Sequence, residues 1–506
     1  MSLPDWLEPL PDAAEQRALD EWAIGERGIA GLELMERAGV GLAALVSERV
    51  PTGRVVVVCG KGNNGGDGLV AARVLRERGR ELDVLTLAPG EELRGDARTN
   101  LARLPGTGPS PFEPAALAGA AAIVDAILGT GFRGEPREPA AAAINSINAA
   151  ASAAAVVLAC DVPSGVDGST GEVAAAAISA AATATFHAAK PGLWIAPGKA
   201  HAGEVRVIDI GIPAGDQADP QVGLIADSVT AAIPRRGADS TKFAAGSVLV
   251  CGGSIGLTGA PCMVAMAAMR AGAGYVTACV PESLNAAFEA HLLEVMTASL
   301  PDDGGGSLVR AGVEAALGRS ERADSLVLGP GLGRHPESFG FARELARRAE
   351  LPLLLDADGL NAHAGELESL AGRSAPTVLT PHAGELARLL GCDSAAVQSH
   401  RLHSVRRAAA AARAIVVLKG DDTLVADPDG RVAVSRGGAP ALATAGTGDV
   451  LSGVIGALLS KAMDAFHAAC AGVLVHARAG RLAAAGIGPE GVIASDVIQA
   501  LPRALP

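Results

Sequence analysis

The chain has 506 residues, of which 49% are hydrophobic and only 2% aromatic, and its formal net charge is −13. This length predicts two or three domains, with cores of Ala, Val and Leu that suit helices lying on a parallel sheet. The acidic charge and the lack of a long Lys/Arg run exclude a groove for nucleic acid. A single phosphorylated metabolite can still be bound by helix N-termini and backbone amides.

The start of the chain and its cysteines favour the cytoplasm. Residues 1–10 carry acids and prolines rather than a basic segment followed by an apolar one, so we expect no signal peptide. The most apolar stretches are Ala-rich and interrupted by polar residues, which disfavours a membrane-spanning helix. The seven cysteines form no C-x-x-C pair, so we expect reduced thiols in the core rather than a zinc site.

Short β-branched runs alternate with longer Ala-, Leu- and Arg-rich stretches along the chain, which is the pattern of an α/β fold. The strands expected in the first half cover residues 54–59, 82–87, 122–128, 156–161, 183–186 and 205–210. Those expected in the second half cover residues 247–251, 275–280, 325–328, 353–356, 377–379 and 415–418. A hairpin of residues 423–426 and 431–434 follows, with its turn at 427–430, and then a helical tail.

Between residues 210 and 233 this pattern breaks at a cluster of Gly, Pro and Asp, and residues 105–114 have the composition of a surface loop. We place the domain boundary at about residue 225, which gives domains 1–225 and 226–506, each long enough to own a core. Ala- and Gly-rich helices suit packing between subunits, so we expect a homo-oligomer.

A glycine-rich segment follows the predicted strand at 54–59. A G-x-G-x-x-G match begins at Gly60 and leads into a helix expected to begin at Leu69. A standard dinucleotide fold also needs an acid at the end of the next strand, but that strand closes with Thr, Leu and Ala at 86–88. The segment is therefore either a tight turn that needs glycine dihedrals or an unusual ligand site.

Polar side chains favour the ligand site. Asn63, Asn64 and Asp67 crowd the segment, and such groups ligate a hard cation or hydrogen-bond ribose and amide groups. Asp125 and Asp161 end two further predicted strands, and the carboxyl ends of parallel strands meet in one crevice. Either aspartate alone is typical of a turn or a helix cap, but together with the asparagines they indicate a shared site.

Four segments carry a family resemblance: LMERAG (34–39), CGKGNNGGDGLVAAR (59–73), LGTGFRG (128–134) and DVPSGVDG (161–168). With residues 185–213, they resemble the NAD(P)H-hydrate epimerase family over nearly all of 10–215. The resemblance implies a Rossmann-like three-layer α/β/α sandwich that interconverts the R and S hydrates at C6 of the nicotinamide ring. Asp161 near the reacting carbon is our hypothesis for the acid/base group.

The same resemblance implies a cation and a set of cofactor-binding residues in the N-terminal domain. A potassium ion would be coordinated by Asn64, Asp125 and Ser164. The residues implied to hold the hydrated cofactor are Asn63, Asn64, Gly65, Gly66, Asp67, Gly129, Thr130, Gly131, Phe132, Arg133, Gly134, Glu135 and Asp161.

The strongest pattern in the second half is TAGTGDVLSG at 444–453. Small residues open an apolar helix there, so backbone N–H groups and the helix dipole create an anion site suited to a transferring phosphoryl group. Asp449 in the first turn is either a helix cap or the base that deprotonates a hydroxyl attacking phosphate. No G-x-x-x-x-G-K-[ST] segment is present, which excludes a P-loop enzyme.

Other predicted strand ends supply groups for a nucleotide site. Residues 419–423 offer a lysine and backbone groups to phosphate, and the glycines of 329–333 permit close approach of a ligand. His382 and Glu385 have a zinc-like i, i+3 spacing but lack a third ligand. Hydrogen bonding by His382 and magnesium-linked water contacts by Glu385 are therefore favoured.

Six further segments resemble a second family: residues 251–261, 328–334, 354–361, 379–391, 417–430 and 445–453. Over about 235–500 the chain resembles the ADP-dependent NAD(P)H-hydrate dehydratases of the ribokinase-like superfamily. The resemblance implies a ribokinase-like α/β/α domain that uses Mg²⁺, with ADP as phosphoryl donor. The 6-hydroxyl of the S hydrate would be phosphorylated with Asp449 as base, and loss of phosphate would restore NAD(P)H and leave AMP.

The residues that this second resemblance implies fall into two sets. Those contacting the S hydrate would be Ala260, Gly331, His382 and Asp449. Those binding ADP or AMP would be Lys419, Gly420, Asp421, Asp422, Thr423 and Gly448.

Two alternatives stay open. The second domain has the scaffold of a vitamin or sugar kinase, although its fusion to the first domain argues against that function. The first domain could be a binding module without catalysis, but its complete set of Asn64, Asp125, Asp161 and Ser164 argues for an active site.

Overall fold

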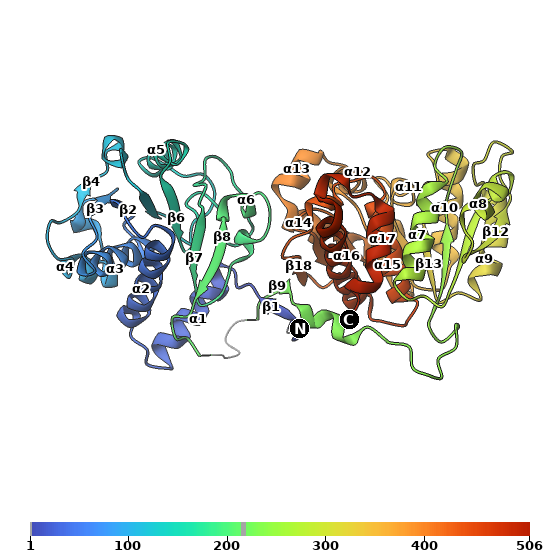
Figure 1. Cartoon of the computed structure of the whole chain (residues 1–506), viewed down its shortest axis with the longest axis horizontal. Coiled ribbons are helices and arrows are strands. Elements are labelled where there is room, and N and C mark those ends of the chain that lie inside the picture. The colour runs from blue at the N-terminus through green and yellow to red at the C-terminus, as the bar shows by residue number, and fades with distance from the viewer. Residues whose placement is uncertain (1–2, 214–218) are drawn as a thin grey trace. The chain divides into compact units, whose positions relative to one another are not determined.

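The computed structural model describes residues 3–213 and 219–506, which form two compact units (Figure 1). The first unit contains residues 9–223, and the second contains residues 4–8 and 224–506. Residues 214–218 of the Gly-, Pro- and Asp-rich stretch, like residues 1–2, lie outside the described residues. Within the described ranges, every helix is too short or too polar to cross a membrane.

The first unit is built on a seven-stranded sheet whose strand order is β4-β3-β2-β5-β6-β7-β8. All its neighbouring strands are parallel. The chain runs from β2 outward to β4, then returns to the other side of β2, so the topological switch point lies between β2 and β5. The strands are β2 (Val55–Cys59), β3 (Leu82–Thr86), β4 (Ser110–Pro111), β5 (Ala122–Ala126), β6 (Val156–Cys160), β7 (Ala182–Phe186) and β8 (Glu204–Ile208).

Alternate residues of β2 divide the core of the first unit into two layers. Val55, Val57 and Cys59 pack with helices α2 and α3, whereas Val56 and Val58 pack with helix α5. Every residue of β2 is buried because helices cover both faces, which explains its uninterrupted apolar run. The helices are α1 (Ala13–Gly25), α2 (Gly31–Arg49), α3 (Asn63–Glu77), α4 (Gly95–Ala102), α5 (Ala140–Ser152) and α6 (Lys199–Ala202).

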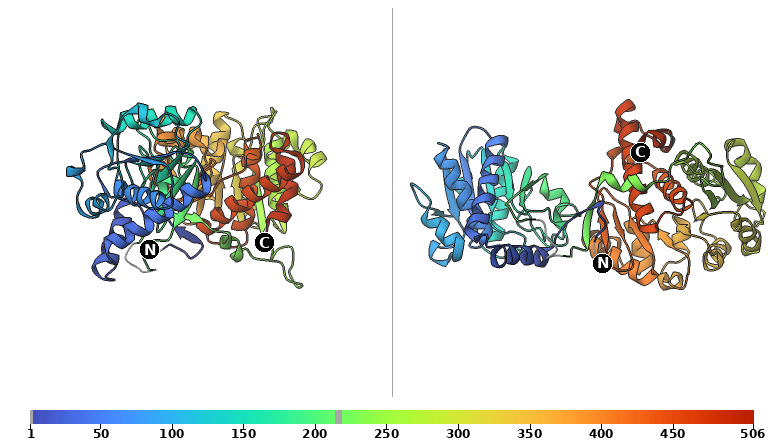
Figure 2. Two further views of the ribbon diagram at one scale, coloured as in Figure 1. Left: turned by 60° about the vertical axis from the view of Figure 1, so that its left-hand side comes forward. Right: turned by 90° about the horizontal axis from the view of Figure 1, so that it is seen from below.

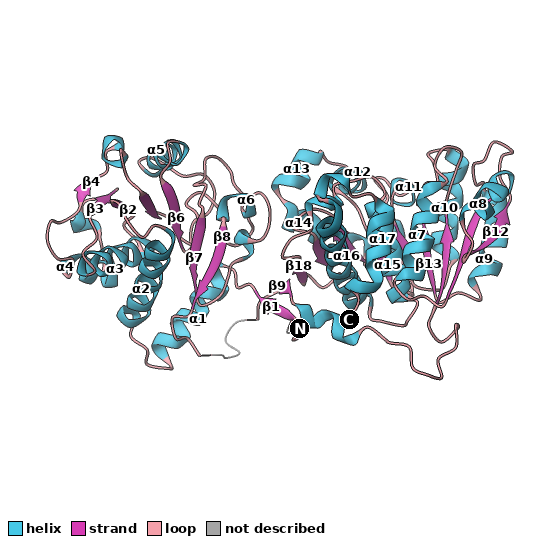
Figure 3. Ribbon diagram, viewed as in Figure 1, coloured by secondary structure: helices cyan, strands magenta, loops and turns pink. Residues whose placement is uncertain are grey.

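The second unit contains an eleven-stranded sheet of order β1-β9-β18-β17-β16-β15-β14-β13-β10-β11-β12 (Figure 3). Strands β10 to β16 pair in parallel, and β16, β17 and β18 pair antiparallel. The switch point lies between β10 and β13. The strands are β1 (Leu7–Pro9), β9 (Val222–Ile225), β10 (Ser247–Cys251), β11 (Tyr275–Pro281), β12 (Met296–Leu300), β13 (Ser325–Leu328), β14 (Leu353–Leu355), β15 (Thr377–Leu379), β16 (Ile415–Leu418), β17 (Leu424–Ala426) and β18 (Val432–Val434).

Helices α7, α15, α16 and α17 of the second unit pack against one another, and α15 lies on strands β10, β13 and β14 (Figure 2). Helix α9 contacts β10, and α14 contacts β16. The helices are α7 (Gly259–Arg270), α8 (Asn285–His291), α9 (Val313–Ser320), α10 (Pro336–Arg348), α11 (Asp358–Asn361), α12 (Ala383–Leu390), α13 (Ser394–Ser399), α14 (Arg401–Ala412), α15 (Thr447–Leu459), α16 (Ala465–Ile487) and α17 (Ala494–Ala504).

The predicted α/β class with parallel sheets in two units is confirmed, and all twelve expected strands and the hairpin are present within a few residues. The short strands β1 and β9, the edge strand β12 and the two-residue β4 inside the predicted loop 105–114 were not expected. They lie in short or polar stretches, where only pairing with a neighbouring strand creates the extended structure.

The N-terminal strand β1 belongs to the sheet of the second unit, where it pairs with β9. The carbonyl of Trp6 accepts a hydrogen bond of 3.0 Å from the Ala226 N–H. The Trp6 ring stacks on the His467 ring, with centroids 4.7 Å apart, and Glu8 forms an ion pair with Arg436. Residues far apart in the sequence therefore complete one edge of this sheet.

Removing the Trp6 ring should loosen this edge of the sheet. We expect Trp6→Ala to destabilise the second unit by about 2 kcal/mol, because it removes the stacking on His467 from a half-buried site. Hydrogen exchange followed by mass spectrometry should then be faster in β9 and β18 and unchanged in β2. Trp194→Ala, which removes a tryptophan from the first unit, is the control. Equal protection of β9 in the variant and the unmodified protein would contradict the role of Trp6.

Candidate active sites

The segment after β2 differs from the turn that the sequence predicts. Helix α3 begins at Asn63, so the prediction of a helix start at Leu69 is wrong. No glycine between residues 60 and 68 has a positive φ. Instead, a Cβ on Gly65 would lie 2.0 Å from the Gly60 carbonyl oxygen. These glycines therefore allow close packing, and tertiary packing outweighs their low helix propensity.

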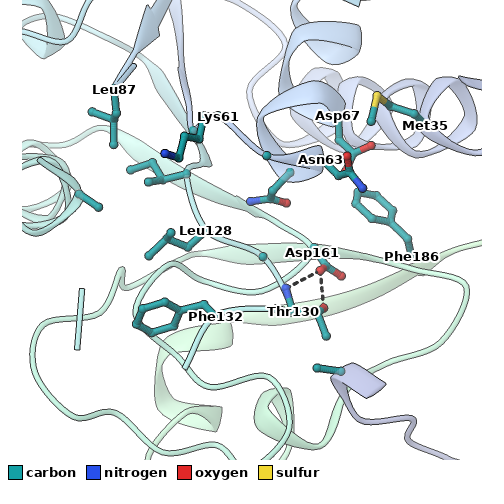
Figure 4. Close-up of a pocket in the computed structure, with 18 of the residues that line it drawn as sticks. Met35, Lys61, Asn63, Asp67, Leu87, Leu128, Thr130, Phe132, Asp161 and Phe186 are labelled. Atoms are coloured by element: carbon teal, nitrogen blue, oxygen red, sulfur yellow. Dashed lines mark hydrogen bonds between the residues drawn. The ribbon is translucent and has the colours of Figure 1, made fainter. Parts of the chain in front are cut away.

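Asp161 lies directly after β6, with a left-handed backbone at φ 65°. Its Oδ2 accepts hydrogen bonds from the backbone N–H of Thr130, at 2.9 Å, and from the Thr130 hydroxyl (Figure 4). Its Oδ1 lies 3.0 Å from Nζ of Lys190. Burial acts to raise the pKa of Asp161, but Lys190 and Thr130 outweigh it, so the pKa is lowered. Asp161 is therefore an ionised carboxylate held in one orientation.

Lys190 is a residue that our sequence reasoning missed. Its side chain is only 1% exposed, and Nζ also donates to the Thr185 hydroxyl at 3.0 Å and to the Phe186 carbonyl at 2.9 Å. A buried ammonium group needs such partners because leaving water is costly. The lysine lies inside the stretch 185–213 that carries the family resemblance, but no local motif distinguishes it from a surface lysine.

Two further carboxyl groups, those of Asp67 and Asp20, line the same cavity as Asp161 and Lys190. Burial raises the pKa of Asp67 well above its usual range, and the negative charge of Asp161 acts in the same direction. Burial likewise raises the pKa of Asp20 on α1. The site therefore combines an ionised carboxylate with a carboxyl group whose environment favours the neutral form, which is the separation that proton transfer requires.

Asn64 lies in the first turn of α3, Asp125 lies near the end of β5, and Ser164 lies in the loop after β6. Oδ1 of Asp125 accepts a 2.6 Å hydrogen bond from the Ser164 hydroxyl, and Oδ2 accepts one of 2.8 Å from the Ser164 N–H. Burial raises the pKa of Asp125 to about 6. Both side-chain atoms of Asn64 are buried without a hydrogen-bond partner in the described part of the chain. An unpaired amide oxygen, a buried carboxylate and a hydroxyl have the oxygen donors that a hard cation prefers.

A cavity of about 1370 Å³ is lined by Asp161, Lys190, Asp67, Asp20 and Asn64, whereas Asp125 and Ser164 lie behind its wall. In Figure 4, Thr130 is joined to Asp161 by two hydrogen bonds, and Phe132 and Leu128 come from the loop that also supplies Thr130. The predicted cofactor-binding residues on its wall are Asn63, Asn64, Asp67, Gly129, Thr130, Gly131, Phe132, Arg133, Gly134, Glu135 and Asp161. Gly65 and Gly66 are not part of the wall, since they face the packed side of α3.

In the second unit, the ends of β14 and β16 bring together a charge cluster. Nζ of Lys419 lies 3.0 Å from Oδ1 of Asp356 and 3.7 Å from Oε2 of Glu385. The Ser452 hydroxyl of α15 donates to Oδ2 of Asp356 at 2.7 Å. Asp356 is 2% exposed and lies inside the segment 354–361, where no local pattern marks it as the partner of Lys419.

Asp449 lies in the first turn of α15, which begins at Thr447. Burial and the nearby carboxylates of Asp356 and Glu385 raise its pKa to about 7, although Lys419 acts to lower it. Among the residues that the structure describes, none forms a capping hydrogen bond with the Asp449 side chain. Of the two alternatives for Asp449, the structure therefore favours a proton acceptor tuned near neutral pH over a helix cap.

His382 caps helix α12. Its Nδ1 accepts a 3.0 Å hydrogen bond from the Gly384 N–H, while Glu385 accepts one of 2.9 Å from the His382 N–H. Burial lowers the pKa of His382, with Glu385 opposing this shift and Lys419 adding to it. A neutral ring that accepts at Nδ1 carries its proton on Nε2, where it can donate to a ligand.

The predicted nucleotide residues 419–423 form a compact loop after β16. The Thr423 hydroxyl donates to the Gly420 carbonyl at 2.6 Å, and Oδ2 of Asp422 accepts a 2.9 Å hydrogen bond from Nε of Arg401. The carboxylate of Asp422 is therefore committed to a buried ion pair. Asp421 accepts a 3.1 Å hydrogen bond from the Gly438 N–H. A nucleotide contact at Asp422 would therefore use its backbone, whereas the exposed carboxylate of Asp421 keeps one oxygen, Oδ2, outside the bond to Gly438.

The remaining predicted residues of the second unit also converge. A Cβ on Gly331 would lie 3.2 Å from Cβ of Ala260 in α7, so these two residues are neighbours at the switch point between β10 and β13. A Cβ on Gly448 would lie 3.5 Å from Nζ of Lys419. The lysine therefore faces the N-terminus of α15, where backbone N–H groups favour an anion.

Each of the two units matches the model of a known protein family. Residues 248–503 match the family model described as NAD(P)H-hydrate dehydratase, and residues 31–192 match the model described as YjeF-related protein N-terminus. The chain is 41% identical to the bifunctional NAD(P)H-hydrate repair enzyme Nnr of Moorella thermoacetica and 38% identical to that of Salinibacter ruber. Each alignment covers 98% of this chain and 96% of the relative.

A solved structure, the ADP/ATP-dependent NAD(P)H-hydrate dehydratase from Bacillus subtilis co-crystallised with ATP/Mg²⁺, is 28% identical with a TM-score of 0.46. The matched region covers 55% of this chain and 94% of the Bacillus subtilis chain. The fold and sites define an α/β enzyme that joins a YjeF-related N-terminal unit to an NAD(P)H-hydrate dehydratase unit, each built on a largely parallel sheet. The chain belongs to the family of bifunctional NAD(P)H-hydrate repair enzymes.

The buried pair of Lys190 and Asp161 in the first unit predicts how the free energy of unfolding depends on pH. Lys190→Met keeps the length of the side chain but leaves Asp161 buried without its counter-charge, which should cost about 3–5 kcal/mol at pH 8. In the unmodified protein, the lowered pKa of Asp161 contributes stability above its unfolded pKa. In the variant, burial instead favours the protonated form, so the loss should shrink between pH 8 and pH 5.

Urea unfolding of both proteins at the two pH values measures this loss. Lys61→Met is a suitable control because the Lys61 side chain is 70% exposed and pairs only loosely with Glu92, at 3.7 Å. A loss for Lys190→Met that does not depend on pH would show that Asp161 is not the group affected.

Proposed function

We propose that this chain restores hydrated NADH and NADPH in two steps. The first unit interconverts the R and S hydrates at C6 of the nicotinamide ring. The second unit dehydrates the S hydrate with ADP, and releases NAD(P)H, AMP and phosphate. The observation that carries this proposal is the presence, in one chain, of the ionised Asp161 pair and of Asp449 at an anion-binding helix N-terminus beside Lys419.

In the first unit, we assign Asp161 as the base that takes the proton of the 6-hydroxyl. That hydroxyl and N1 share C6, so the C6–N1 bond can break to leave an aldehyde, and closure on its other face gives the other epimer. N1 takes up a proton when the bond breaks and returns it on closure. Asp67, whose environment favours the neutral form, faces the same cavity and is suited to lend that proton.

The residues proposed to hold the hydrated cofactor in the first unit are Asn63, Asn64, Asp67, Gly129 to Glu135 and Asp161, while Gly65 and Gly66 let α3 pack closely behind them. Asn64, Asp125 and Ser164 would hold a potassium ion, which supplies a fixed positive charge that orders the loop ends around Asp161. The unpaired Asn64 amide supports this assignment.

In the second unit, Asp449 takes the proton of the 6-hydroxyl, and the oxygen attacks the terminal phosphorus of ADP, so AMP leaves. Hydroxide is a poor leaving group and phosphate a good one, so the N1 lone pair can then expel phosphate from C6. Loss of a proton from C5 restores the dihydropyridine. Lys419 faces the position of the transferred phosphoryl group, and the backbone N–H groups of α15 stabilise the negative charge of that group.

The hydrate-binding residues proposed for this unit are Ala260, Gly331, His382 and Asp449, and the nucleotide-binding residues are Lys419 to Thr423 and Gly448. Glu385 would hold magnesium through water, and the ion would neutralise charge on the phosphates. We further propose a cytoplasmic homo-oligomer whose partners are small molecules.

The vitamin-kinase alternative explains neither the first unit nor the family membership along the whole chain. A first domain without catalysis is likewise disfavoured, because the ionised Asp161 and the neutral-favouring Asp67 face one cavity.

A racemic hydrate separates the two activities. With Mg²⁺, K⁺ and ADP, the unmodified chain should restore the whole pool of NADPH, measured by absorbance of the reduced nicotinamide. Asp161→Asn should slow epimerisation by about 10²–10⁴-fold, so that recovery pauses near half. Asp449→Asn should slow dehydration by a similar factor while R and S forms still interconvert.

Each variant is the folding control for the unit that it leaves intact, and near-ultraviolet circular dichroism checks the altered unit. Rapid full recovery by Asp161→Asn would sink its assignment. No recovery by the unmodified chain with ADP or ATP would defeat the dehydratase and favour the vitamin kinase.

The raised pKa of Asp449 gives the second activity a defined pH dependence. Asp449 must be ionised to accept a proton, so kcat for the S hydrate should rise with pH and reach half its plateau near pH 7. Asp356→Asn removes a negative charge that raises this pKa, so the half-point should move to lower pH. A rate that is constant between pH 6 and pH 8 in the unmodified protein would contradict proton acceptance by Asp449.

A further inference from the structure

One face of helix α1 borders the cavity of the first unit. This face carries three residues spaced four positions apart, Gln16, Asp20 and Ile24, and all three line the cavity wall. The start of the helix is fixed, because the Ala13 N–H donates to the Ser169 hydroxyl in the loop after β6 at 3.1 Å. The family model for this domain begins at residue 31, so α1 lies outside the part of the chain that it matches.

Gln16 has a polar atom without a partner at this wall. Its side chain donates from Nε2 to Oδ1 of Asp20 at 3.0 Å, which fixes the orientation of the amide. The residue is 8% exposed, and Oε1 has no hydrogen-bond partner among the described residues. A buried acceptor left unpaired costs free energy, so its persistence beside a cavity points to a donor on the ligand.

The chemistry of the neighbourhood indicates which part of the substrate lies here. Asp20 interacts electrostatically with both Lys190 and Asp161, so α1 faces the groups assigned to C6 of the ring. The carboxamide of the hydrated nicotinamide is attached at C3, across the ring from C6. It is the only group of the ring end with two N–H donors, and Gln16 and Asp20 offer two adjacent acceptors.

We propose that Gln16 and Asp20 bind the carboxamide of the hydrated nicotinamide ring, with one N–H donating to Oε1 of Gln16 and the other to the Asp20 carboxyl group. Helix α1 is then a specificity element of the epimerase, and it fixes which edge of the ring faces Asp161. This inference rests on the epimerase function proposed above.

A substrate without the amide donors tests the proposal. The probes are the separated R hydrates of NADH and of reduced 3-acetylpyridine adenine dinucleotide, in which a methyl ketone replaces the carboxamide. Conversion of R to S is followed by chromatography with Asp449→Asn in the background, so that dehydration does not consume the product. This background should prefer the amide substrate by at least about tenfold in kcat/KM, because the ketone leaves Oε1 unpaired.

Gln16→Met should remove that preference. It should lower kcat/KM for the amide hydrate by about tenfold and change that for the ketone hydrate by less than twofold. Gln221→Met is the matched control, because Gln221 lies away from the cavity wall. Asp20→Ala should also reduce the preference and provides a second variant should Gln16→Met fold poorly.

The outcomes separate the two proposals. Equal rates for the two hydrates before any change at Gln16, or equal losses on both hydrates in folded Gln16→Met and Asp20→Ala, would overturn carboxamide binding. Equal losses of kcat/KM on the two hydrates would indicate that Gln16 and Asp20 bind a group that both substrates share, such as the ribose. Absence of any epimerisation of the NADH hydrate would instead defeat the proposed function.

Discussion

In each unit, a lysine held 3.0 Å from a carboxylate compensates a group of three acids. Lys190 lies among Asp20, Asp67 and Asp161, and Lys419 lies among Asp356, Glu385 and Asp449. One positive charge cannot hold three carboxyl groups ionised in a buried site, and in each unit the pKa of at least one acid is raised. In the first unit the ionised Asp161 therefore lies near a carboxyl group whose environment favours the neutral form, and in the second unit Asp449 has a pKa of about 7.

The two sites use this constraint in opposite ways. In the first unit, the acid next to the lysine, Asp161, is the one assigned to the chemistry, and its pKa is lowered. In the second unit, Asp356 takes the lysine and the Ser452 hydroxyl, which leaves Asp449 with a pKa of about 7. A base that must activate a hydroxyl for attack on phosphorus benefits from that higher pKa, because a stronger base accepts the proton more readily.

The sequence was sufficient for the α/β class and for the residues at most strand ends, since β-branched runs followed by Gly, Asn and Asp are local patterns. It failed where a role depends on distant partners. Lys190 resembles a surface lysine until β7 and its loop place it against Asp161. Helix α3 begins at Asn63 only because glycine lets it pack against the loop after β2, whereas local propensity predicts a later start.

The first 25 residues illustrate the same limit in its strongest form. Leu7–Pro9 forms a strand in the sheet of the second unit, and α1, which begins four residues later, supplies Gln16 and Asp20 to the cavity of the first unit. No motif marks either role, because a three-residue strand and a polar helix are common in any sequence. Strand β1 depends on partners hundreds of residues away, and the position of α1 depends on Ser169. The N-terminal segment therefore contributes to both units, and dividing the chain into two consecutive domains would separate the second unit from its strand β1.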